Sequence, residues 1–501
     1  MIGIHITIGT IAWCFSGLVF LYHCIRMIRT SRAIACLGAR APSINRLPFG
    51  IDIVYQNIND KEIRKLGFWQ SKLKPACGAS ELRSTLTTAE FTVGTSDRFI
   101  FTTDPEIIKA MLSTQFADYG KGESFHRSWN KVLSNCIFAS DWELWSRTRN
   151  LIQPIFEREH IVDTELFEKH LQKLIRLLRG SEYPSQSEQA DIQSLFVRYT
   201  IDVFMDSLLG KDTDSLGNQV RQNAHPTRKS GFFTWDKSRD LYDDLRDVLQ
   251  LYIQVVLSRT TEELSQKLSR KDTFLEALAR FTRDPRVLCG QLIAMLIAGP
   301  DTTASSLTFC MFELSRNPEV VAKLRSEIGS RLGIGSDGRK PTYVDLKEMN
   351  YLSAVINETL RLHPAVPFNC RVALHNTTLP RGGCPDGLSP VGVPRGTEVM
   401  YSTMLMQRRA DLYPTKGHPG YFDPLNGGPR ICIGQQFAII DMGYTITRIL
   451  QAYEQIVALP ACGKETVGDL ELRFGGRSLR PACEVDCVFV GEGEGNKRAE
   501  N

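Results

Sequence analysis

The sequence predicts a mainly α-helical body with a small β portion, preceded by one membrane-spanning helix. Three observations lead to this fold class. The N-terminal stretch is apolar and uncharged, several segments in the middle of the chain carry apolar residues at helical spacing, and the strand signals are short and cluster late. The chain has 501 residues, 42% of them hydrophobic, so it can bury a large core, as about three domains or as one large helical fold.

The N-terminal run from Ile2 to Ile25 contains no Asp, Glu, Lys or Arg. As a helix rising about 1.5 Å per residue, it can cross a bilayer core of about 30 Å. Arg26, Arg29 and Arg32 follow directly, and basic residues at this flank predict that the body after them is cytosolic. A secretory signal peptide is the alternative, but the run is long and no basic segment precedes it. We therefore predict a single-pass membrane protein with a cytosolic body.

The predicted anchor covers residues 1–30, and residues 31–50, which show no clear helical stripe, are expected to form a linker. Residues 51–490 are expected to form the folded body. The tail over residues 491–501 is mostly Gly, Asn and charged residues, a composition that favours disorder.

Within the body, helical spacing predicts a series of amphipathic or buried helices. They are expected over Glu157–Arg179, Asp191–Leu209, Arg239–Ser258, Pro285–Ser315, Val320–Leu332, Leu352–Leu362 and Gln435–Ile456. The strand signals are weaker and lie around Val391–Tyr401 and Pro481–Val490.

Charge and cysteine usage exclude some classes of function. The 60 basic and 56 acidic residues give a formal charge of +4, so nothing in the composition indicates a nucleic-acid partner. The 13 cysteines include no C-x-x-C pair, which argues against a zinc ribbon or a thioredoxin-type motif. Most of these cysteines are therefore expected to be free thiols in a reducing compartment.

A glycine-rich run from Asn426 to Gly434 contains Cys432 and leads into the helix predicted after it. Glycines allow the backbone to approach a flat cofactor closely. The N–H groups and dipole at a helix N-terminus are expected to lower the pKa of the thiol and favour a thiolate, which on haem iron favours O–O bond cleavage. Taken alone, such a run is more often only a turn with a buried cysteine.

The segment around Ala298 is a second candidate for chemistry. Residues 292–298 are apolar on all sides, which predicts a core helix, and Pro300 is expected to break its hydrogen-bond ladder. Asp301 and Thr302 then predict a groove for dioxygen in which both side chains pass protons. The alternative is a kink at which the threonine hydroxyls bond back to the preceding turn.

Two shorter patterns have a functional meaning only in a particular structural environment. Glu358 and Arg361, at spacing i, i+3, usually form a surface bridge worth about 0.3 kcal/mol, so their meaning depends on burial. Trp145 and Arg149, at i, i+4, can place an indole and a guanidinium at a haem edge, or they can be ordinary residues of an amphipathic helix.

Together these motifs resemble the signatures of the cytochrome P450 family, in the family's order: A-G-x-D-T-T at 298–303, E-x-x-R at 358–361 and G-x-R-x-C-x-G at 428–434. The resemblance implies the fold of that family, a haem b cofactor and a haem-thiolate monooxygenase. It also assigns roles. Cys432 is the expected iron ligand, and Thr302 with Asp301 the oxygen-activating pair; Glu358 with Arg361 braces the fold, and the other expected cofactor contacts are Trp145, Arg149, Arg371, Gly428, Arg430 and Gly434.

Three segments suggest a subgroup, since residues 282–288, 377–390 and 426–437 look like the fungal alkane and fatty-acid hydroxylases. Those enzymes hydroxylate terminal carbons of long chains with electrons from an NADPH-dependent cytochrome P450 reductase. The resemblance therefore implies a lipophilic alkyl or fatty-acyl substrate, which agrees with a membrane anchor.

One segment departs from the family pattern. Family members carry a longer meander before the Cys motif, with an Arg that joins the E-x-x-R pair, whereas this chain has only residues 414–425 there. Arg408 and Arg409 are the candidate replacements. The short segment leaves two alternatives open: a haem-binding protein with impaired or non-oxidative activity, and a membrane-tethered structural protein that no longer holds haem.

Overall fold

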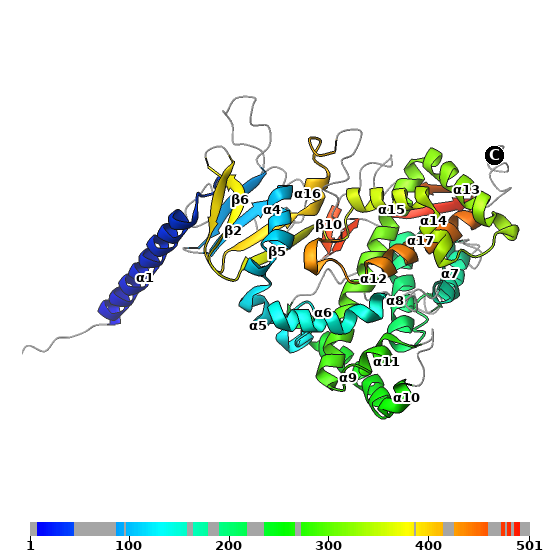
Figure 1. The fold of residues 1–501 in the computed structure, drawn as a ribbon, viewed down its shortest axis with the longest axis horizontal. Helices are drawn as coiled ribbons and strands as arrows, with labels where there is room; N and C mark the ends of the chain where they lie inside the picture. Colours follow the sequence, from blue (N-terminus) through cyan, green and yellow to red (C-terminus); the bar gives the residue numbers. More distant parts are fainter. Residues whose placement is uncertain are drawn as a thin grey trace, which may run out of the picture. The chain divides into compact units, whose positions relative to one another are not determined.

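The computed structural model describes most of the chain. The described residues are 8–44, 87–94, 97–157, 164–178, 190–217, 235–265, 272–384, 387–413, 425–458, 472–475, 478–481 and 485–490. They divide between two compact units (Figure 1). The first, here called the sheet unit, lies within 1–122, 368–406 and 427–429; the second, the helical unit, lies within 123–367, 407–426 and 430–501.

The sheet unit contains a five-stranded sheet in the order β1-β2-β8-β5-β3. Its strands are β1 (Thr88–Val93), β2 (Asp97–Thr102), β3 (Tyr119–Gly120), β5 (Phe368–Ala373) and β8 (Glu398–Ser402). The pair β2 and β8 is parallel, and the other neighbours are antiparallel. Aromatic and β-branched residues such as Phe91, Phe99 and Ile100 suit this pleated surface, and the Phe91 and Phe99 rings stack 5.1 Å apart.

The remaining elements of the sheet unit are short, apart from the N-terminal helix. A second sheet pairs β6 (Thr377–Gly383) with β7 (Ser389–Val393). The chain enters α4 (Pro105–Lys109) through Asp104, whose side chain caps the helix; a π turn at 110–114 and a 3₁₀ turn at 116–118 follow. Helix α16 (Thr403–Gln407) ends at the border of the unit.

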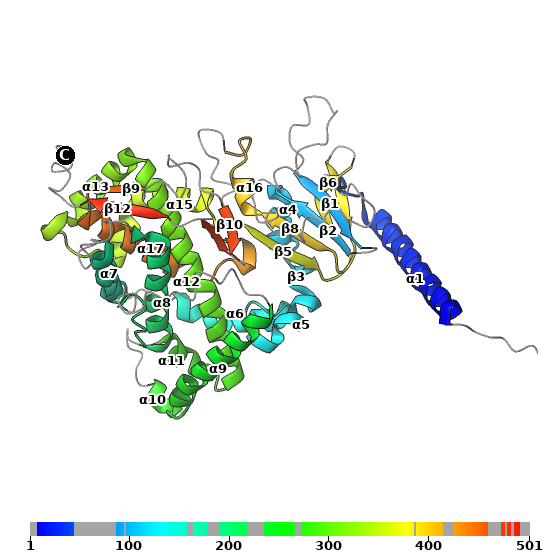
Figure 2. The same ribbon diagram turned by 180° about the vertical axis from the view of Figure 1, so that it is seen from behind.

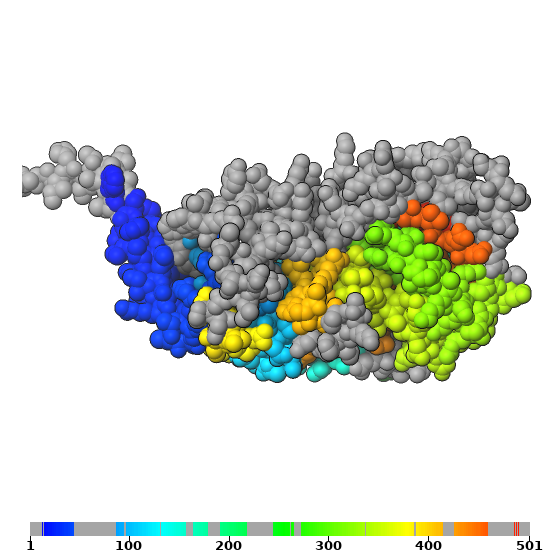
Figure 3. Space-filling view, turned by 90° about the horizontal axis from the view of Figure 1, so that it is seen from above, coloured from blue at the N-terminus to red at the C-terminus, as the bar shows by residue number. Residues whose placement is uncertain are grey.

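The N-terminal helix α1 spans Ile8–Leu37, so it runs beyond the predicted anchor boundary at residue 30. The prediction that the linker begins at residue 31 is therefore wrong. Backbone bridges at Ala39 and Ser43, to Val391 and Glu90, then tie the chain to strands of the same unit. Figure 3 shows the blue atoms of α1 lying open on the face that it draws, and large apolar side chains are exposed along the helix: Trp13, Phe15, Leu18, Phe20, Leu21, Tyr22, Ile25, Met27 and Ile28.

Helices dominate the second unit (Figure 2). They are α5 (Gly122–Leu133, whose first residue belongs to the sheet unit), α6 (Trp142–Glu157), α7 (Thr164–Leu178), α8 (Ile192–Leu209), α9 (Trp235–Leu257), α10 (Thr261–Ser265), α11 (Phe274–Ala279), α12 (Pro285–Arg316), α13 (Pro318–Leu332), α14 (Tyr343–Glu348), α15 (Asn350–Leu362) and α17 (Gln435–Ala452). Two small sheets add β4 (Ala190–Asp191), β12 (Asp486–Val490) and β9 (Gln455–Ala458) in one, and β10 (Leu472–Gly475) with β11 (Ser478–Pro481) in the other.

Helix α12 forms the centre of the helical unit and packs against α8, α9, α15 and α17. Asp284 caps its N-terminus by accepting from the Arg286 amide, and Pro285 occupies the first turn, where its missing N–H costs nothing. By length and composition α12 could also cross a bilayer, but 61% of its apolar window is buried inside the protein. Such burial is what a core helix of a folded body shows.

The predicted fold class, mainly helical with a small β portion, is confirmed, and most predicted helices are found within a few residues of their expected ends. Several details were wrong. Glu157, the expected start of one helix, is the last residue of α6, and α7 begins at Thr164. Pro481, the expected start of the last strand, ends β11, and β12 begins at Asp486. The helix after the Cys loop ends at Ala452, because Tyr453 turns to an extended conformation and Ile456 lies in strand β9. The stretch 391–401 is two strands separated by a turn, and the strands β1 and β2 lie early in the chain. Residues 45–50 of the predicted linker and the predicted disordered tail lie outside the described residues.

Candidate active site

The Cys loop is closed on itself just before α17. The Cys432 amide donates to the Leu425 carbonyl at 3.0 Å, and the Asn426 side-chain amide donates to the Arg430 carbonyl at 3.2 Å. Asn426 adopts a left-handed φ of 67°, which its short polar side chain tolerates, and Gly434 is the N-cap residue of α17. The loop therefore holds Cys432 immediately before the N-terminus of a long helix, as the sequence predicts.

Gly428, which belongs to the sheet unit, shows why this run needs glycine. Its φ is +63°, and a Cβ atom built on it would overlap the backbone carbonyl of Leu112 in the π turn of the same unit. Any other residue here would force the two backbone segments apart.

The environment of the Cys432 thiol differs from the prediction. The side chain is exposed by surface area, yet enough protein surrounds the sulfur for burial to raise its pKa above the ordinary value. The Gly434 amide and the Arg149 charge lower the pKa, but they do not outweigh burial. The expectation that the helix N-terminus alone gives a thiolate is therefore wrong in its net direction.

The structure brings Trp145, Arg149 and Arg430 together beside this loop. Trp145 and Arg149 lie on α6, and the Arg149 guanidinium donates to the Ile431 carbonyl at 3.0 Å. The Arg149 and Arg430 guanidinium carbons lie 5.9 and 4.7 Å from the centre of the Trp145 ring, distances at which a cation is attracted to an indole face.

Arg430 and Arg371, two of the expected cofactor contacts, have different partners. Arg430, in the helical unit, is 7% exposed and pairs with Asp141 at 2.8 Å, while it also donates to the Ser140 carbonyl at 2.9 Å. Arg371, in the sheet unit, is 2% exposed and donates to the Cys370 carbonyl at 2.8 Å and the Asn369 amide oxygen at 3.2 Å. Within the described part of the chain, no carboxylate forms an ion pair with Arg371.

Helix α12 continues through Pro300 without ending there. Pro300 has no N–H for the Leu296 carbonyl, so the helical hydrogen-bond ladder lacks one bond at this point, as expected, while α12 as a whole packs against α8. The Thr302 hydroxyl donates to the Ala298 carbonyl at 2.7 Å, which is the back-bonded arrangement that the sequence left open as the alternative. Gly299 lies against the Phe204 ring of α8, where a Cβ atom would overlap the ring.

The Glu358 and Arg361 pair is well formed but only partly buried. Two guanidinium nitrogens of Arg361 donate to the Glu358 carboxylate at 2.7 and 2.6 Å, and the two side chains are 19% and 55% exposed respectively. The hydrogen bond from Arg361 to Glu358 raises the pKa of Arg361. Arg361 also donates to the Gln407 carbonyl at 2.7 Å and lies 5.1 Å from the Tyr413 ring, so a carbonyl and a ring provide its further contacts.

Neither candidate replacement arginine pairs with Glu358 in the described residues. Arg408 donates to the Leu362 carbonyl at 2.8 Å, and Arg409 pairs with Asp411 at 3.0 Å. The sequence left the meaning of this pair dependent on burial, and the Glu358 side chain is 55% exposed. Residues 414–424, most of the short segment, lie outside the described residues.

A buried acid on α17 was not predicted from the sequence. Asp441 is 0% exposed and accepts from the Tyr199 hydroxyl at 2.7 Å and from Thr445 at 3.4 Å. Burial raises its pKa from 3.8 to about 7. The signal that could have revealed it is the single acidic residue in the otherwise uncharged first half of this helix.

Comparisons with known proteins agree with these motifs. The model of the family described as "Cytochrome P450" matches residues 90–459. Cytochrome P450 monooxygenase pvhE of Talaromyces variabilis is 39% identical over 496 residues, with 89% of this chain and 90% of the relative covered. Cytochrome P450 52A3-A of Candida maltosa is 36% identical, with 72% and 76% covered, and cytochrome P450 52A1 of Candida tropicalis is 38% identical, with 71% and 72% covered.

The chain belongs to the cytochrome P450 family. It is a member of the monooxygenases of that family, which bind haem through an axial cysteine thiolate. The residues present fit such a cofactor: a cysteine is held in a closed loop, a cluster of one indole and two guanidinium groups lies beside that loop, and the buried cation Arg371 lacks an anionic partner in the described residues.

Proposed function

We propose that this protein inserts one oxygen atom from dioxygen into a lipophilic alkyl or fatty-acyl chain, with Cys432 as the iron ligand. The observation that supports the assignment most strongly is the closed loop that holds this thiol before α17. Other thiols of the helical unit have a different environment. Cys310 on α12 is fully buried, and burial raises its pKa to about 12, so it is a small core residue.

Bound haem supplies the site of dioxygen activation, and a thiolate ligand donates electron density that favours O–O cleavage. The protein must therefore stabilise Cys432 in its ionised form. The Gly434 amide and the Arg149 charge both lower the pKa of the Cys432 thiol and so favour the thiolate. A positively charged metal bound to the sulfur would lower this pKa further and offset the effect of burial.

Thr302 is suited to accept a hydrogen bond on the substrate side of α12. Its own hydrogen is committed to the Ala298 carbonyl at 2.7 Å, so the hydroxyl oxygen presents its lone pairs to a bound group or water. Asp301 is the neighbouring half-buried carboxylate and can exchange protons with solvent. We assign the two residues to proton delivery.

Arg371 is assigned to a haem propionate. A buried guanidinium with only neutral acceptors gains from an anion, since the charge has already lost its hydration. Arg149, Arg430 and Trp145 are proposed to border the cofactor, with Gly428 and Gly434 allowing the backbone to approach it. Glu358 and Arg361 are proposed to hold the end of α15 to the segment at Gln407.

Substrate, partner and location rest on the resemblance of the three segments to the fungal alkane and fatty-acid hydroxylases, together with the 52A relatives. Electrons are proposed to come from an NADPH-cytochrome P450 reductase. The open apolar surface of α1 supports a single-pass anchor in the endoplasmic reticulum membrane with a cytosolic body. A haem protein without oxidative activity is not favoured, because a named monooxygenase is 39% identical over 89% of this chain.

The test is product formation by the full chain in membranes with an NADPH-cytochrome P450 reductase, with dodecanoic acid and hexadecane as probes. We expect hydroxylated product, and Thr302→Ala should retain haem while product per NADPH falls several-fold. Thr308→Ala is the matched control, since its hydroxyl makes the same back-bond, 2.8 Å to Ala304, further along α12. Equal coupling in Thr302→Ala and the parent would remove Thr302 from proton delivery, and an intact haem-thiolate spectrum without either product would refute the substrate class.

Membrane attachment has its own test. Deletion of residues 1–32 removes most of α1 but keeps Arg40, which pairs with Glu90 at 2.8 Å in the sheet unit. We expect a folded, haem-binding body that sediments less with membranes. Unchanged sedimentation would contradict the anchor.

A further inference from the structure

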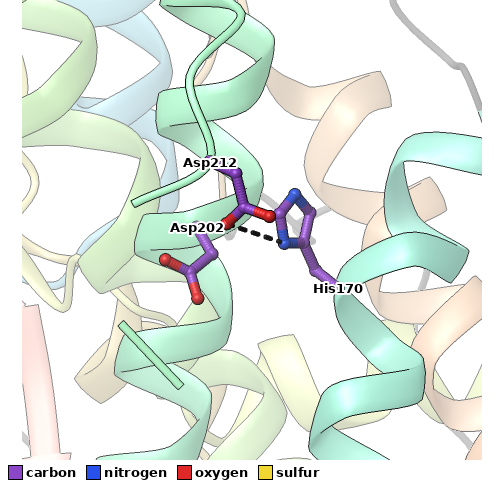
Figure 4. A group of neighbouring side chains, drawn as sticks. All are labelled: His170, Asp202 and Asp212. Atoms are coloured by element: carbon purple, nitrogen blue, oxygen red, sulfur yellow. Dashed lines mark ion pairs between the residues drawn. The ribbon is translucent and has the colours of Figure 1, made fainter. Parts of the chain in front are cut away.

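Helices α7 and α8 and the segment after α8 bring a histidine and several carboxylates together inside the helical unit. His170 lies on α7, Asp202 on α8, and Asp212 three residues after the end of α8. One potential ligand atom from each of the three lies within 4.8 Å of the others. Figure 4 shows the Asp212 carboxylate beside the imidazole ring of His170, with a dashed line between them, and the Asp202 side chain nearby.

The two ring nitrogens of His170 have different surroundings. The side chain is 0% exposed, and Nε2 lies 2.9 Å from Asp206 Oδ2, a distance at which the ring N–H donates to that carboxylate. The hydrogen bond from His170 is the main cause that lowers the pKa of Asp206, so the acceptor is ionised. The Nδ1 atom is buried and has no hydrogen-bond partner among the described residues; the Asp212 Oδ1 atom is 3.9 Å away. In the neutral ring with its proton on Nε2, Nδ1 carries the lone pair that can bind a metal ion.

Hydrogen bonds orient the Asp202 carboxylate and leave one lone pair of its Oδ2 atom available to a ligand. Its Oδ1 atom accepts from the Thr213 hydroxyl at 2.5 Å and the Ser215 amide at 2.7 Å, while Oδ2 accepts only from the Leu216 amide at 3.1 Å. A carboxylate oxygen has two lone pairs, so one remains on Oδ2.

Asp212 is also oriented before any ligand arrives. Lys173 lies 3.1 Å and Lys169 3.5 Å from its Oδ2 atom, and Oδ1 accepts from the Asp214 amide at 3.0 Å and faces His170. Both lysines contact Oδ2, so they can keep their positions if Oδ1 binds a metal ion. Lys169 and Lys173 pair with the carboxylates of Asp206, Asp212 and Asp214. Asp202 interacts electrostatically with Arg198, which also interacts with Asp191.

We propose that His170 Nδ1, Asp202 and Asp212 bind one divalent transition-metal ion of the zinc type. An imidazole nitrogen with carboxylate oxygens is a ligand set that zinc accepts, at about 2.0 to 2.2 Å, with water completing the coordination. Asp206 is the outer partner that fixes the imidazole tautomer, an arrangement typical of metal-bound histidines. The separations of up to 4.8 Å must shorten on binding, to about 3.4 Å for ligand atoms around a tetrahedral ion, so the side chains have to move toward one another.

The proposed ion ties α7 to α8 and to the segment that follows α8. On α8, Phe204, two residues from Asp202, packs against Gly299 on α12. The site therefore stabilises the helix pair that supports α12, but it supplies no group to the reaction. Its expected signature is a metal-dependent gain in thermal stability with an unchanged haem spectrum.

The experiment uses the full-length haem-loaded protein, treated with EDTA, freed of chelator and dialysed against zinc chloride at pH 7.5. Zinc per protein and Tm are measured for the parent, Asp212→Asn, His170→Gln and Asp214→Asn. Asp214→Asn is the matched control, because Asp214 lies on the same segment and binds Lys173 at 2.8 Å but supplies no ligand.

We expect Asp212→Asn and His170→Gln to lose one zinc equivalent and the zinc-dependent rise in Tm, while Asp214→Asn keeps both. If the buried His170 variant does not fold, Asp212→Asn decides, since that side chain is partly exposed. Equal zinc binding and equal Tm shifts in the parent and Asp212→Asn would overturn the proposal. So would a parent that binds no zinc or whose Tm does not rise with zinc.

Discussion

Arg430 in the helical unit and Arg371 in the sheet unit are both buried guanidinium groups, but among the described residues only Arg430 pairs with a carboxylate. Asp141 lies 2.8 Å from Arg430, whereas in the described part of the chain Arg371 donates to a backbone carbonyl and to an amide oxygen. Burial of a charge costs free energy unless an opposite charge is present. We propose from this difference that Arg430 chiefly stabilises the fold and that Arg371 chiefly binds an anionic ligand.

Removal of Asp141 should have the largest effect on stability. Asp141→Ala leaves Arg430 buried without its anion, and we expect a loss of about 3 kcal/mol, at the lower end of the usual cost because Asp141 is partly exposed. Urea unfolding with and without haem measures it. Glu143→Ala is the control, since its pair with Arg147 is exposed on both sides and should matter little. If the two variants unfold alike, Arg430 does not depend on its partner.

Arg371→Gln should give the opposite pattern. We expect roughly tenfold faster haem loss to an acceptor protein, because the propionate loses its cation, while the haem-free protein keeps its stability or gains some. Arg395→Gln, an exposed position of the same unit, is the control. A large loss of stability without haem would mean that Arg371 is structural and would end the distinction between the two arginines.

Asp441 is a buried acid whose hydrogen-bond donors among the described residues are hydroxyl groups, so it, too, lacks an opposite charge there. Its pKa of about 7 lies above the usual 3.8, so the folded protein binds more protons than the unfolded chain between these values. Stability should therefore fall as pH rises, by about 2 kcal/mol between pH 5 and pH 7. Asp441→Asn should remove this slope and be more stable than the parent at pH 7. Parallel stability curves for variant and parent would show that Asp441 is ionised throughout.

Glu358→Gln should have the smallest effect, below about 1 kcal/mol, because half of the Glu358 side chain is exposed. Arg361→Ala should cost more, since the Gln407 carbonyl also loses its donor. Thermal unfolding of the two variants at low and high salt compares them. A Glu358→Gln variant as unstable as Arg361→Ala would show that the ion pair itself, not the contact with the Gln407 carbonyl, holds α15 in place.

The sequence was sufficient for the helices and the Cys loop because both are set locally. The apolar period of residues 285–315 and the glycine-rich run at 426–434 need no knowledge of distant residues. The strands β2 and β8 depend on pairing between segments some 300 residues apart, which a local period does not contain. The early hairpin of β1 and β2 was missed for the same reason.

The properties of the site residues were harder to predict than their positions. The net pKa direction of Cys432 depends on how much protein surrounds the thiol, and the exposure of Glu358 depends on packing around α15. Neither quantity can be read from a motif. The different partners of Arg371 and Arg430 likewise arise from contacts such as Asp141, whose proximity to the Cys loop no local pattern indicates.

The account depends most on Cys432 as the iron ligand. Serine keeps the size of the side chain but replaces a thiol that the metal can ionise with a hydroxyl that stays protonated. The direct measurement is the carbon-monoxide difference spectrum of the reduced protein for Cys432→Ser, with Ser at Cys289, Cys310 and Cys370 as controls. We predict that only Cys432→Ser loses the thiolate-type band, together with oxygenation. Persistence of that band in Cys432→Ser would contradict the ligand assignment and the function built on it.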